Sequence, residues 1–292
     1  MSEARAAAGA LVWYRRPGRL RCAVGGGLVG LVLLAAVVAP WVAPSAPDTQ
    51  DLLRRLQPPA WMADGTSTNV LGTDHLGRDI LSRVLYGARV SVLVGLVSVL
   101  ISGTIGVALG LVAGYYGSWV DLTIMKLVEI FLTIPFVLLA LVVMALFGQG
   151  LAILIVVICL NRWIHYCRVI RGDVLSLRER DFVTGARALG VSTARILVRH
   201  VLPNTIASLS VVTTFSLATI ILIEASLSFL GLGVPPTIAT WGSMLNESRA
   251  YMIPSWWTSV FPGLAIFLTV LGVNVLGDGV RDAFDPRLRR GA

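Results

Sequence analysis

The stretch VSVLVGLVSVLISGTIGVALGLVAGY, residues 90–115, contains no charged side chain. A helix needs about 20 apolar residues to cross a hydrocarbon layer about 30 Å thick. Within the stretch, Gly106, Gly110 and Gly114 recur at four-residue spacing and share one helical face, where small residues let two helices approach closely. The stretch therefore predicts a transmembrane helix that packs tightly within a bundle.

Five further apolar runs indicate that the chain crosses a bilayer about six times. They occupy residues 22–42, 122–147, 151–170, 206–232 and 260–276. Three of the six runs are longer than one crossing needs, which allows tilt or extension beyond the membrane. Arginines precede the first run, as in a cleaved signal peptide, but its length exceeds the roughly 7 to 15 apolar residues of such peptides and favours a retained anchor. The expected fold is an all-α polytopic membrane protein.

Composition excludes several other classes. The 292 residues are 56% hydrophobic and 14% charged, with a mean hydropathy of +0.80, whereas about a quarter of a soluble domain is charged. The net charge of +8 does not indicate a nucleic-acid partner, because the arginines lie between apolar runs and not on a soluble surface with exposed aromatics. The three cysteines are isolated and lack disulfide or zinc spacing.

Arginine placement predicts the orientation of the chain. Segments 1–21 and 168–204 and the tail after residue 276 hold five, seven and four arginines. In a six-span protein these segments lie on one side, which is the cytoplasm if basic loops stay inside. Both termini are then cytoplasmic. We divide the chain into a cytoplasmic tail (1–21), a first span with an extracytoplasmic segment (22–89), a core transmembrane domain (90–280) with a cytoplasmic loop (171–204), and a second cytoplasmic tail (281–292).

The cytoplasmic loop RGDVLSLRERDFVTGARALGVSTARILVRHVLPN, residues 171–204, predicts two short helices. Phe182, Ala186 and Leu189 share a face of the first helix, and Gly190 is a suitable residue to end it. Ser192 can cap the second stretch, and Pro203 interrupts it before the next span. The periodicity is compatible with either lipid headgroups or a protein partner on the apolar face.

Residues 182–204 resemble the EAA loop of ABC-importer permeases, in which a short acidic-Ala-Ala helix, a glycine and a downstream Leu-Pro form the helix that docks on the ATPase. Gly190, Leu202 and Pro203 match its spacing, but Thr184 and Gly185 replace Glu-Ala. The missing carboxylate removes one polar contact, and Gly185 costs the helix about 0.5–1 kcal/mol relative to alanine. The resemblance implies ATPase coupling by Asp181, Phe182, Thr184, Gly185, Ala186, Leu189 and Gly190.

Four more strings are similar to the C-type permeases of dipeptide and oligopeptide importers. They are LGTDHLGRDILSRVLYGARVSVLVG (71–95), EASLSFLGLGVPP (224–236), WGSMLNESR (241–249) and GDGVRDAFDPRLR (277–289). The resemblance implies a permease of a bacterial inner-membrane ABC importer for peptides, with a homologous second permease, two ATPase domains that bind ATP and magnesium, and an extracytoplasmic binding protein. Nickel, glutathione and oligosaccharide importers use similar permeases, so the solute stays open.

The chain itself lacks an ATP site. A phosphate-binding loop ends in glycine and lysine, but the single lysine, Lys126, follows Met125. An intramembrane enzyme is a competing class, yet His75, His165 and His200 show none of the spacings that metal or carboxylate active sites use. We therefore expect no catalytic residue, no metal and no cofactor in this chain.

Glu224 is the sharpest single-residue candidate, because no charged residue lies within about twenty positions of it. It is a candidate for the translocation pathway or its gate, and it is the best argument for a proton-coupled secondary carrier. The alternative is a buried structural carboxyl group. The loop 180–204 argues against the carrier, since a self-powered carrier needs no docking helix.

Other polar groups carry weaker expectations. Asp74, Arg78, Asp79 and Arg83 could pair with one another as i, i+4 neighbours or contact a binding protein, and His75 is expected on the surface and not as a ligand. Lys126 and Glu129 are expected to pair. Arg162 and His165 lie deep in the fourth run, where a charge costs about 2.5–3.5 kcal/mol. Either that helix extends into the cytoplasm or Arg162 faces a partner or a wet cavity. The last helix is expected to be capped by Asp278, Arg281, Asp282 and Asp285.

Overall fold

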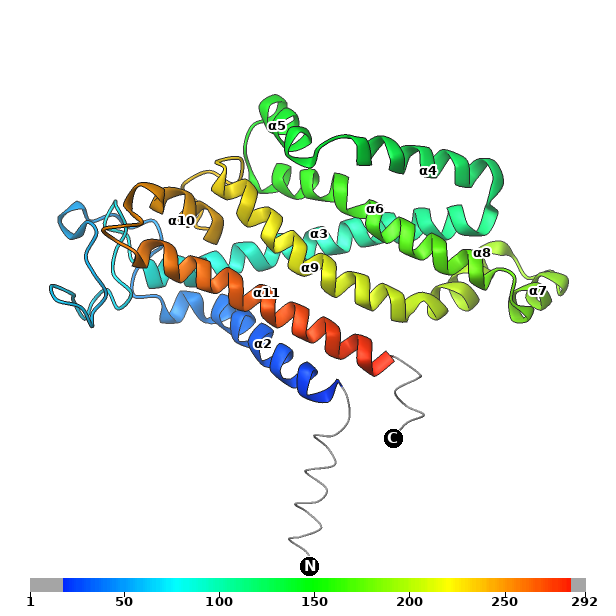
Figure 1. Cartoon of the computed structure of the whole chain (residues 1–292), viewed down its shortest axis with the longest axis horizontal. Helices are drawn as coiled ribbons and strands as arrows, with labels where there is room; N and C mark the ends of the chain where they lie inside the picture. Colours follow the sequence, from blue (N-terminus) through cyan, green and yellow to red (C-terminus); the bar gives the residue numbers. More distant parts are fainter. Residues whose placement is uncertain (1–17, 285–292) are drawn as a thin grey trace, which may run out of the picture.

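The computed structural model describes residues 18–284, which form a bundle of long helices (Figure 1). Within this range there is no strand, and Thr73 and Asp79 form one isolated bridge. Five helices are long and apolar enough to cross a membrane, and a bent pair adds a sixth span if it is counted as one. The expected all-α polytopic fold is confirmed. The bundle consists of α2 (Arg19–Val42), α3 (Ile80–Tyr116), α4 (Ser118–Thr133), α5 (Phe136–Phe147), α6 (Leu151–Leu177), α9 (Ile206–Phe229) and α11 (Trp257–Phe284).

The third apolar run is not one straight helix. α4 ends at Thr133, α5 begins at Phe136, and the two axes differ by 87°. Pro135 explains the break, because its ring lacks an N–H donor and forces the preceding residue away from the helical region. Ile134 accordingly has an extended ψ of 118°. The third crossing is therefore a bent pair of helices.

The bundle has two unlike ends, which Figure 1 shows at the left and right. We call the first the α10 end; it holds α10 (Trp241–Ser248), η1 (Leu52–Arg54), η4 (Arg249–Tyr251) and the segment before α3. We call the second the α7 end; it holds α7 (Asp181–Ala188), α8 (Thr193–Ile196), η2 (Leu197–Val201) and η3 (Leu202–Thr205).

The two ends of the described chain lie together. Arg21 Nη1 on α2 is 3.1 Å from Asp282 Oδ2 on α11. Asp282 is therefore paired with α2, while the expected capping of the last helix stays a prediction and Asp285 lies outside the described residues. A Cβ atom on Gly25 of α2 would lie 2.3 Å from the backbone nitrogen of Leu276 on α11. α2 is thus packed closely against α11, and its retention as an anchor stays a prediction.

Glycines bring α3 and α6 into backbone contact. A Cβ atom on Gly106 would lie 2.3 Å from the carbonyl oxygen of Trp163, and one on Gly110 would lie 2.7 Å from that of Cys167. A Cβ atom on Gly114 would lie 2.7 Å from the Cβ atom of Val174. The predicted glycine face is therefore the face that packs on α6, and no larger residue fits there without moving a helix.

Candidate functional site

α7 is attached to the bundle along one side. Val183 is fully buried and packs with Val174, Ile196 and Val201 from the neighbouring elements. Arg180 precedes the helix with extended backbone angles, and Asp181 lies in the first turn. A negative side chain at a helix N-terminus is favourable because the helix dipole is positive there. The sequence thus fixes both the start of α7 and the face by which it is held.

The outer side of α7 carries the predicted coupling residues. Phe182 is 43% exposed and Leu189 is 85% exposed. Thr184 and Gly185 are exposed as well, whereas Ala186 is half-buried at the boundary with the bundle. The apolar stripe predicted from the periodicity is therefore not buried within the described chain. It lies open at the α7 end of the molecule.

The end of α7 is built as predicted. Gly190 has a φ of +76°, which favours glycine, and the Val191 N–H donates to the Ala186 carbonyl at 3.1 Å. This bond satisfies a carbonyl that would otherwise lack a partner at the helix end. Thr184 Oγ1 donates to the Asp181 carbonyl at 3.1 Å, so this hydroxyl is used within the helix.

The following stretch differs from the prediction in one detail. Ser192 occupies the N-cap position of α8, but its side chain makes no capping hydrogen bond. The chain then continues through the π turns of η2 and the 3-10 turns of η3 around Pro203 before α9 begins at Ile206. The expected interruption at Pro203 is therefore present.

Glu224 is completely buried between α3 and α9. Its carboxylate accepts hydrogen bonds of 2.9 Å from Ser91 Oγ on α3 and from Ser228 Oγ one turn further along α9. Paired hydroxyl donors are what a buried carboxyl group requires. The residue links two helices in this structure, and its role in a pathway or gate stays a prediction.

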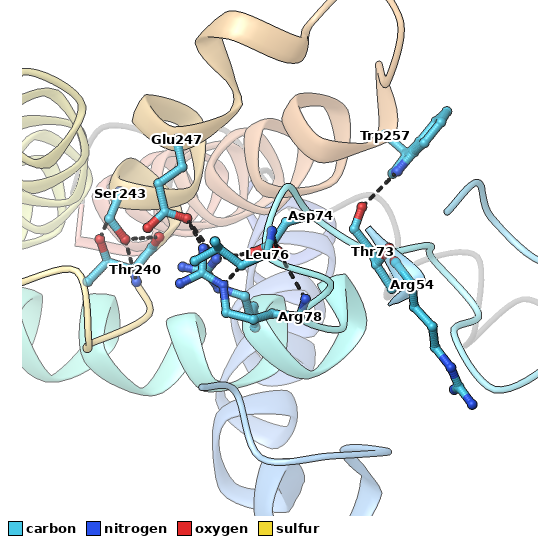
Figure 2. Close-up of polar contacts among 10 residues, drawn as sticks. Arg54, Thr73, Asp74, Leu76, Arg78, Thr240, Ser243, Glu247 and Trp257 are labelled. Atoms are coloured by element: carbon cyan, nitrogen blue, oxygen red, sulfur yellow. Dashed lines mark hydrogen bonds and ion pairs between the residues drawn. The ribbon is translucent and has the colours of Figure 1, made fainter. Parts of the chain in front are cut away.

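A buried ion cluster lies at the α10 end (Figure 2). Its four members are Asp74, Arg78, Arg83 and Glu247. Arg78 Nε is 2.6 Å from Asp74 Oδ2, and Arg83 Nη1 is 2.7 Å from Glu247 Oε2. Arg78 also contacts Glu247, and Arg83 contacts Asp74. The two arginine side chains are only 6% and 2% exposed. The cluster therefore joins the start of α3 to α10 inside the protein.

The expected pairing at i, i+4 spacing is confirmed for Asp74 and Arg78, which are buried, and a contact with a binding protein stays a prediction. The residues at helical spacing are not solvated neighbours, because a partner from α10 covers them. Asp79 is not part of the cluster: it caps α3, accepting from Ser82 N at 2.7 Å and from Asn69 Nδ2 at 3.0 Å. Sequence reasoning missed Glu247, which is 164 positions from Arg83 and has no local signal.

The electrostatics of the cluster follow from its burial. Burial alone would raise the pKa of Asp74, but Arg83, Arg78 and two backbone amides outweigh it and lower that pKa below its usual value. Burial lowers the pKa of His75, although Asp74 and Glu247 oppose that effect. His75 is partly exposed, as expected of a surface histidine, and it stacks on Tyr251 with ring centroids 5.6 Å apart.

Three residues at this cluster are close enough to be considered as metal ligands. Ligand atoms of Asp74, His75 and Glu247 lie within 4.8 Å of one another. Both carboxylates, however, are already paired with Arg78 and Arg83. A divalent cation would have to displace or face two arginines, so the donor set does not fit one. We assign no metal to this cluster.

Two further ion pairs lie on α4. Lys126 Nζ is 2.8 Å from Glu129 Oε2, which confirms the expected pair, and both side chains are exposed. Arg171 on α6 contacts Asp121 on α4 through two bonds of 2.5 and 2.6 Å. Sequence reasoning missed this second pair because its members are 50 positions apart. It ties the α7 ends of α4 and α6 together.

A cavity of about 910 Å³ lies between α6, α9 and α11. Arg162 and His165 lie on its wall, so Arg162 does face a cavity, and α6 also continues to Leu177. Glu224 is not among its lining residues. The walls combine charged, hydroxyl and apolar side chains, contributed by Arg162, His165, Arg168, Val169, Val211, Val212, Thr214, Phe215, Ser216, Thr219, Asn274, Gly277, Asp278 and Arg281.

Comparison with known proteins defines the class. Residues 106–290 match the model of the family described as binding-protein-dependent transport system inner membrane component. Residues 23–59 match the N-terminal transmembrane domain of oligopeptide transport permease C. The chain belongs to this family of inner-membrane transport components.

Individual relatives support the assignment. The chain is 44% identical to the di/tripeptide transport system permease protein DppC of Pseudomonas aeruginosa, over 91% of this chain and 89% of the relative. It is 41% identical to the glutathione transport system permease protein GsiD of Pectobacterium atrosepticum, over 95% and 91%. An inward-facing structure of the MetNI methionine ABC transporter matches with a TM-score of 0.56 at 20% identity, over 68% of this chain and 95% of that chain. This last likeness concerns the fold.

Proposed function

We propose that the chain is the permease subunit of an ATP-driven ABC importer that moves short peptides across the bacterial cytoplasmic membrane. The names of its relatives support the solute class, since they are permeases for di- and tripeptides and for glutathione, itself a small peptide. The observation that carries the coupling role is the outward position of Phe182 and Leu189 on α7.

The position of α7 favours a protein partner over lipid headgroups. α6 has 27 residues and is therefore about 40 Å long, which exceeds the hydrocarbon thickness of about 30 Å. α7 lies beyond the adjoining ends of α3 and α4 along the bundle (Figure 1). The headgroup layers extend the membrane to about 40–45 Å, so α7 lies at its outer limit, where its exposed apolar side chains can meet another protein. We assign that protein as the ATPase.

The remaining parts of the transporter follow from this assignment. The α7 end is then cytoplasmic, with both termini on that side, and the α10 end receives solute from an extracytoplasmic binding protein. The single lysine of this chain, Lys126, is paired with Glu129 on α4 and follows no glycine, so it cannot belong to a phosphate-binding loop. ATP and magnesium are therefore assigned to two separate ATPase domains. A homologous second permease completes the pathway in the bilayer.

The function is tested by uptake of a labelled dipeptide into proteoliposomes. The chain is reconstituted with its second permease, ATPases and binding protein, and we expect uptake only with internal ATP. Nickel and oligosaccharides serve as competing solutes, and neither should reduce uptake. Peptide uptake that runs on a proton gradient without the ATPases would instead show a secondary carrier.

A further inference from the structure

The cavity between α6, α9 and α11 has an unbalanced charge. Its wall holds Arg162, Arg168 and Arg281, together with His165, against one carboxylate, Asp278. Arg162 Nε is buried without a hydrogen-bond partner. The buried arginines of the α10 end differ, because Arg78 and Arg83 each contact the carboxylates of Asp74 and Glu247. Three arginines and a histidine that face one carboxylate in the same cavity, with one buried guanidinium donor left unsatisfied, indicate a site for an anion.

The positive groups form a ladder along α6. Arg162, His165 and Arg168 follow one another at three-residue steps, so Arg162 and Arg168 are separated by about 9 Å along the axis. Arg281 lies on α11, near the end that meets α2. The ladder therefore runs from the middle of the bundle towards the α7 end.

Depth identifies the kind of anion. Arg162 is eleven positions from Leu151, the start of α6, and therefore about 16 Å along the helix, near the middle of a layer about 30 Å thick. A charge facing lipid there would cost about 2.5–3.5 kcal/mol, so Arg162 needs a partner protein or a wet cavity, and the cavity is what this chain provides. A lipid phosphate at the membrane surface can reach Arg281 but not Arg162. The ligand must therefore be small and able to travel along the cavity.

The other walls suit a small amphipathic solute. Ser216, Thr219 and Asn274 offer neutral hydrogen-bonding groups, and Phe215, 69% exposed, offers an apolar surface. The volume of about 910 Å³ lies within the range of about 300–1,000 Å³ usual for small-molecule sites. Charge, polarity and size together match a short peptide with a free carboxylate.

We propose that this cavity binds the C-terminal carboxylate of the peptide during its passage, with Arg162 as the deepest contact and Arg168 and Arg281 as later ones. A guanidinium group fits a carboxylate because it donates two parallel hydrogen bonds. This proposal rests on the proposed function, since it assigns a subsite to the same solute.

The test is photolabelling of the permease pair with its ATPases in nanodiscs of neutral lipid, without nucleotide or binding protein. The probe is alanyl-photoleucine with a free carboxylate, compared with its C-terminal amide, and adducts are mapped by mass spectrometry. We expect the free acid to label the cavity at least about ten times more than the amide, because a charged hydrogen-bonded pair contributes about 1.5–3 kcal/mol, or about 10- to 150-fold.

Substitutions sharpen the result. Arg162→Gln should reduce labelling by the acid to the level of the amide and leave the amide unchanged, whereas Arg162→Lys should retain most of it. Arg89→Gln is the matched control, because Arg89 is an exposed arginine of α3 outside the cavity. If Arg162→Gln does not assemble, Arg168→Gln takes its place with the same expectation.

Three outcomes would overturn the site: equal labelling by acid and amide, labelling of neither kind in the cavity, or adducts confined to other helices. Native mass spectrometry tests the alternative that a phospholipid occupies the cavity. A phospholipid that is retained by the wild type and lost in Arg162→Gln, without carboxylate-dependent labelling, makes this a lipid site. The proposed function fails separately, if the wild-type complex shows no ATP-dependent uptake of any peptide.

Discussion

The two ends of the bundle treat their functional residues in opposite ways. At the α10 end, four charged groups satisfy one another inside the chain, and even Glu247 is only 19% exposed. At the α7 end, Leu189 is 85% exposed and Phe182 is 43% exposed, while Val183 alone of α7 is fully buried. The charged groups of the α10 end are thus paired within the chain, whereas the apolar side chains of α7 are left exposed, as the proposed contact with an ATPase requires. Changes at the first should therefore alter stability, and changes at the second should alter assembly.

Glu247→Gln should lower stability more than any other proposed variant. A small effect would contradict the contrast between the two ends of the bundle. The substitution leaves Arg78 and Arg83 with one carboxylate between them, and removing one partner from a buried ion network costs about 3–5 kcal/mol. We expect a large drop in the unfolding temperature of the purified chain in detergent. Glu179→Gln is the matched control, since Glu179 is 72% exposed beside Arg178 and such pairs contribute about 0–1 kcal/mol. Equal drops for both variants would contradict a buried cluster.

Phe182→Ala should leave stability unchanged and weaken assembly. Loss of a large aromatic anchor from an interface costs about 2 kcal/mol or more, which is about a thirtyfold loss of association. We expect the ATPases to dissociate from membranes and uptake to stop, with insertion and pairing to the second permease retained. Co-purification and uptake assays measure both.

Thr184→Glu is the control for that variant. It restores the acidic residue of the EAA pattern on the exposed side of α7 and should be tolerated in both assays. If Phe182→Ala keeps full ATPase binding and full uptake, α7 faces lipid and the coupling role is wrong.

Two glycines of the α7 segment should respond in opposite directions. Gly190→Ala forces alanine into the left-handed region at φ +76° and should destabilise the helix end by about 1–2 kcal/mol. Gly185→Ala lies within α7, where no atom lies within 4 Å of an added Cβ, and should stabilise the helix by about 0.5–1 kcal/mol. Hydrogen exchange of the α7 amides reports both. A shift of the same sign would contradict the described helix end.

Lowering the pH should reduce the stability of the α10 end in two steps. Near neutral pH, this is the smallest of the predicted effects. The folded-state pKa of His75 is lowered from 6.5, so its contribution is complete above pH 6.5 and is lost as pH falls through the lower folded value. Asp74, whose pKa is lowered from 3.8, loses its contribution only in stronger acid. Unfolding temperature measured against pH should show both steps, and His75→Asn should remove the upper one.

Local patterns predicted what local chemistry determines. The apolar runs, the glycine face of α3 and the end of α7 at Gly190 depend on neighbours a few positions away, and each was visible in the sequence. The ion cluster was not, because Arg83 and Glu247 meet only when α10 folds back onto α3. The break at Pro135 carried a local signal that the length of the apolar run concealed. The position of Arg162 on a cavity wall is one of the alternatives that the sequence predicts, because a charged residue deep in an apolar run needs a polar environment.

The contact of α3 with α6 also limits how this protein can move. Gly106, Gly110 and Gly114 leave no room for even one methyl group over three successive turns. Two helices in such contact cannot slide or rotate past each other without steric clashes. During a transport cycle, α3 and α6 should therefore move together as one rigid body. Bending is left to the joint at Ile134 and Pro135, where helical hydrogen bonds are already missing. Gly110→Ala would therefore disturb the contact between α3 and α6 without affecting the bend at Ile134 and Pro135.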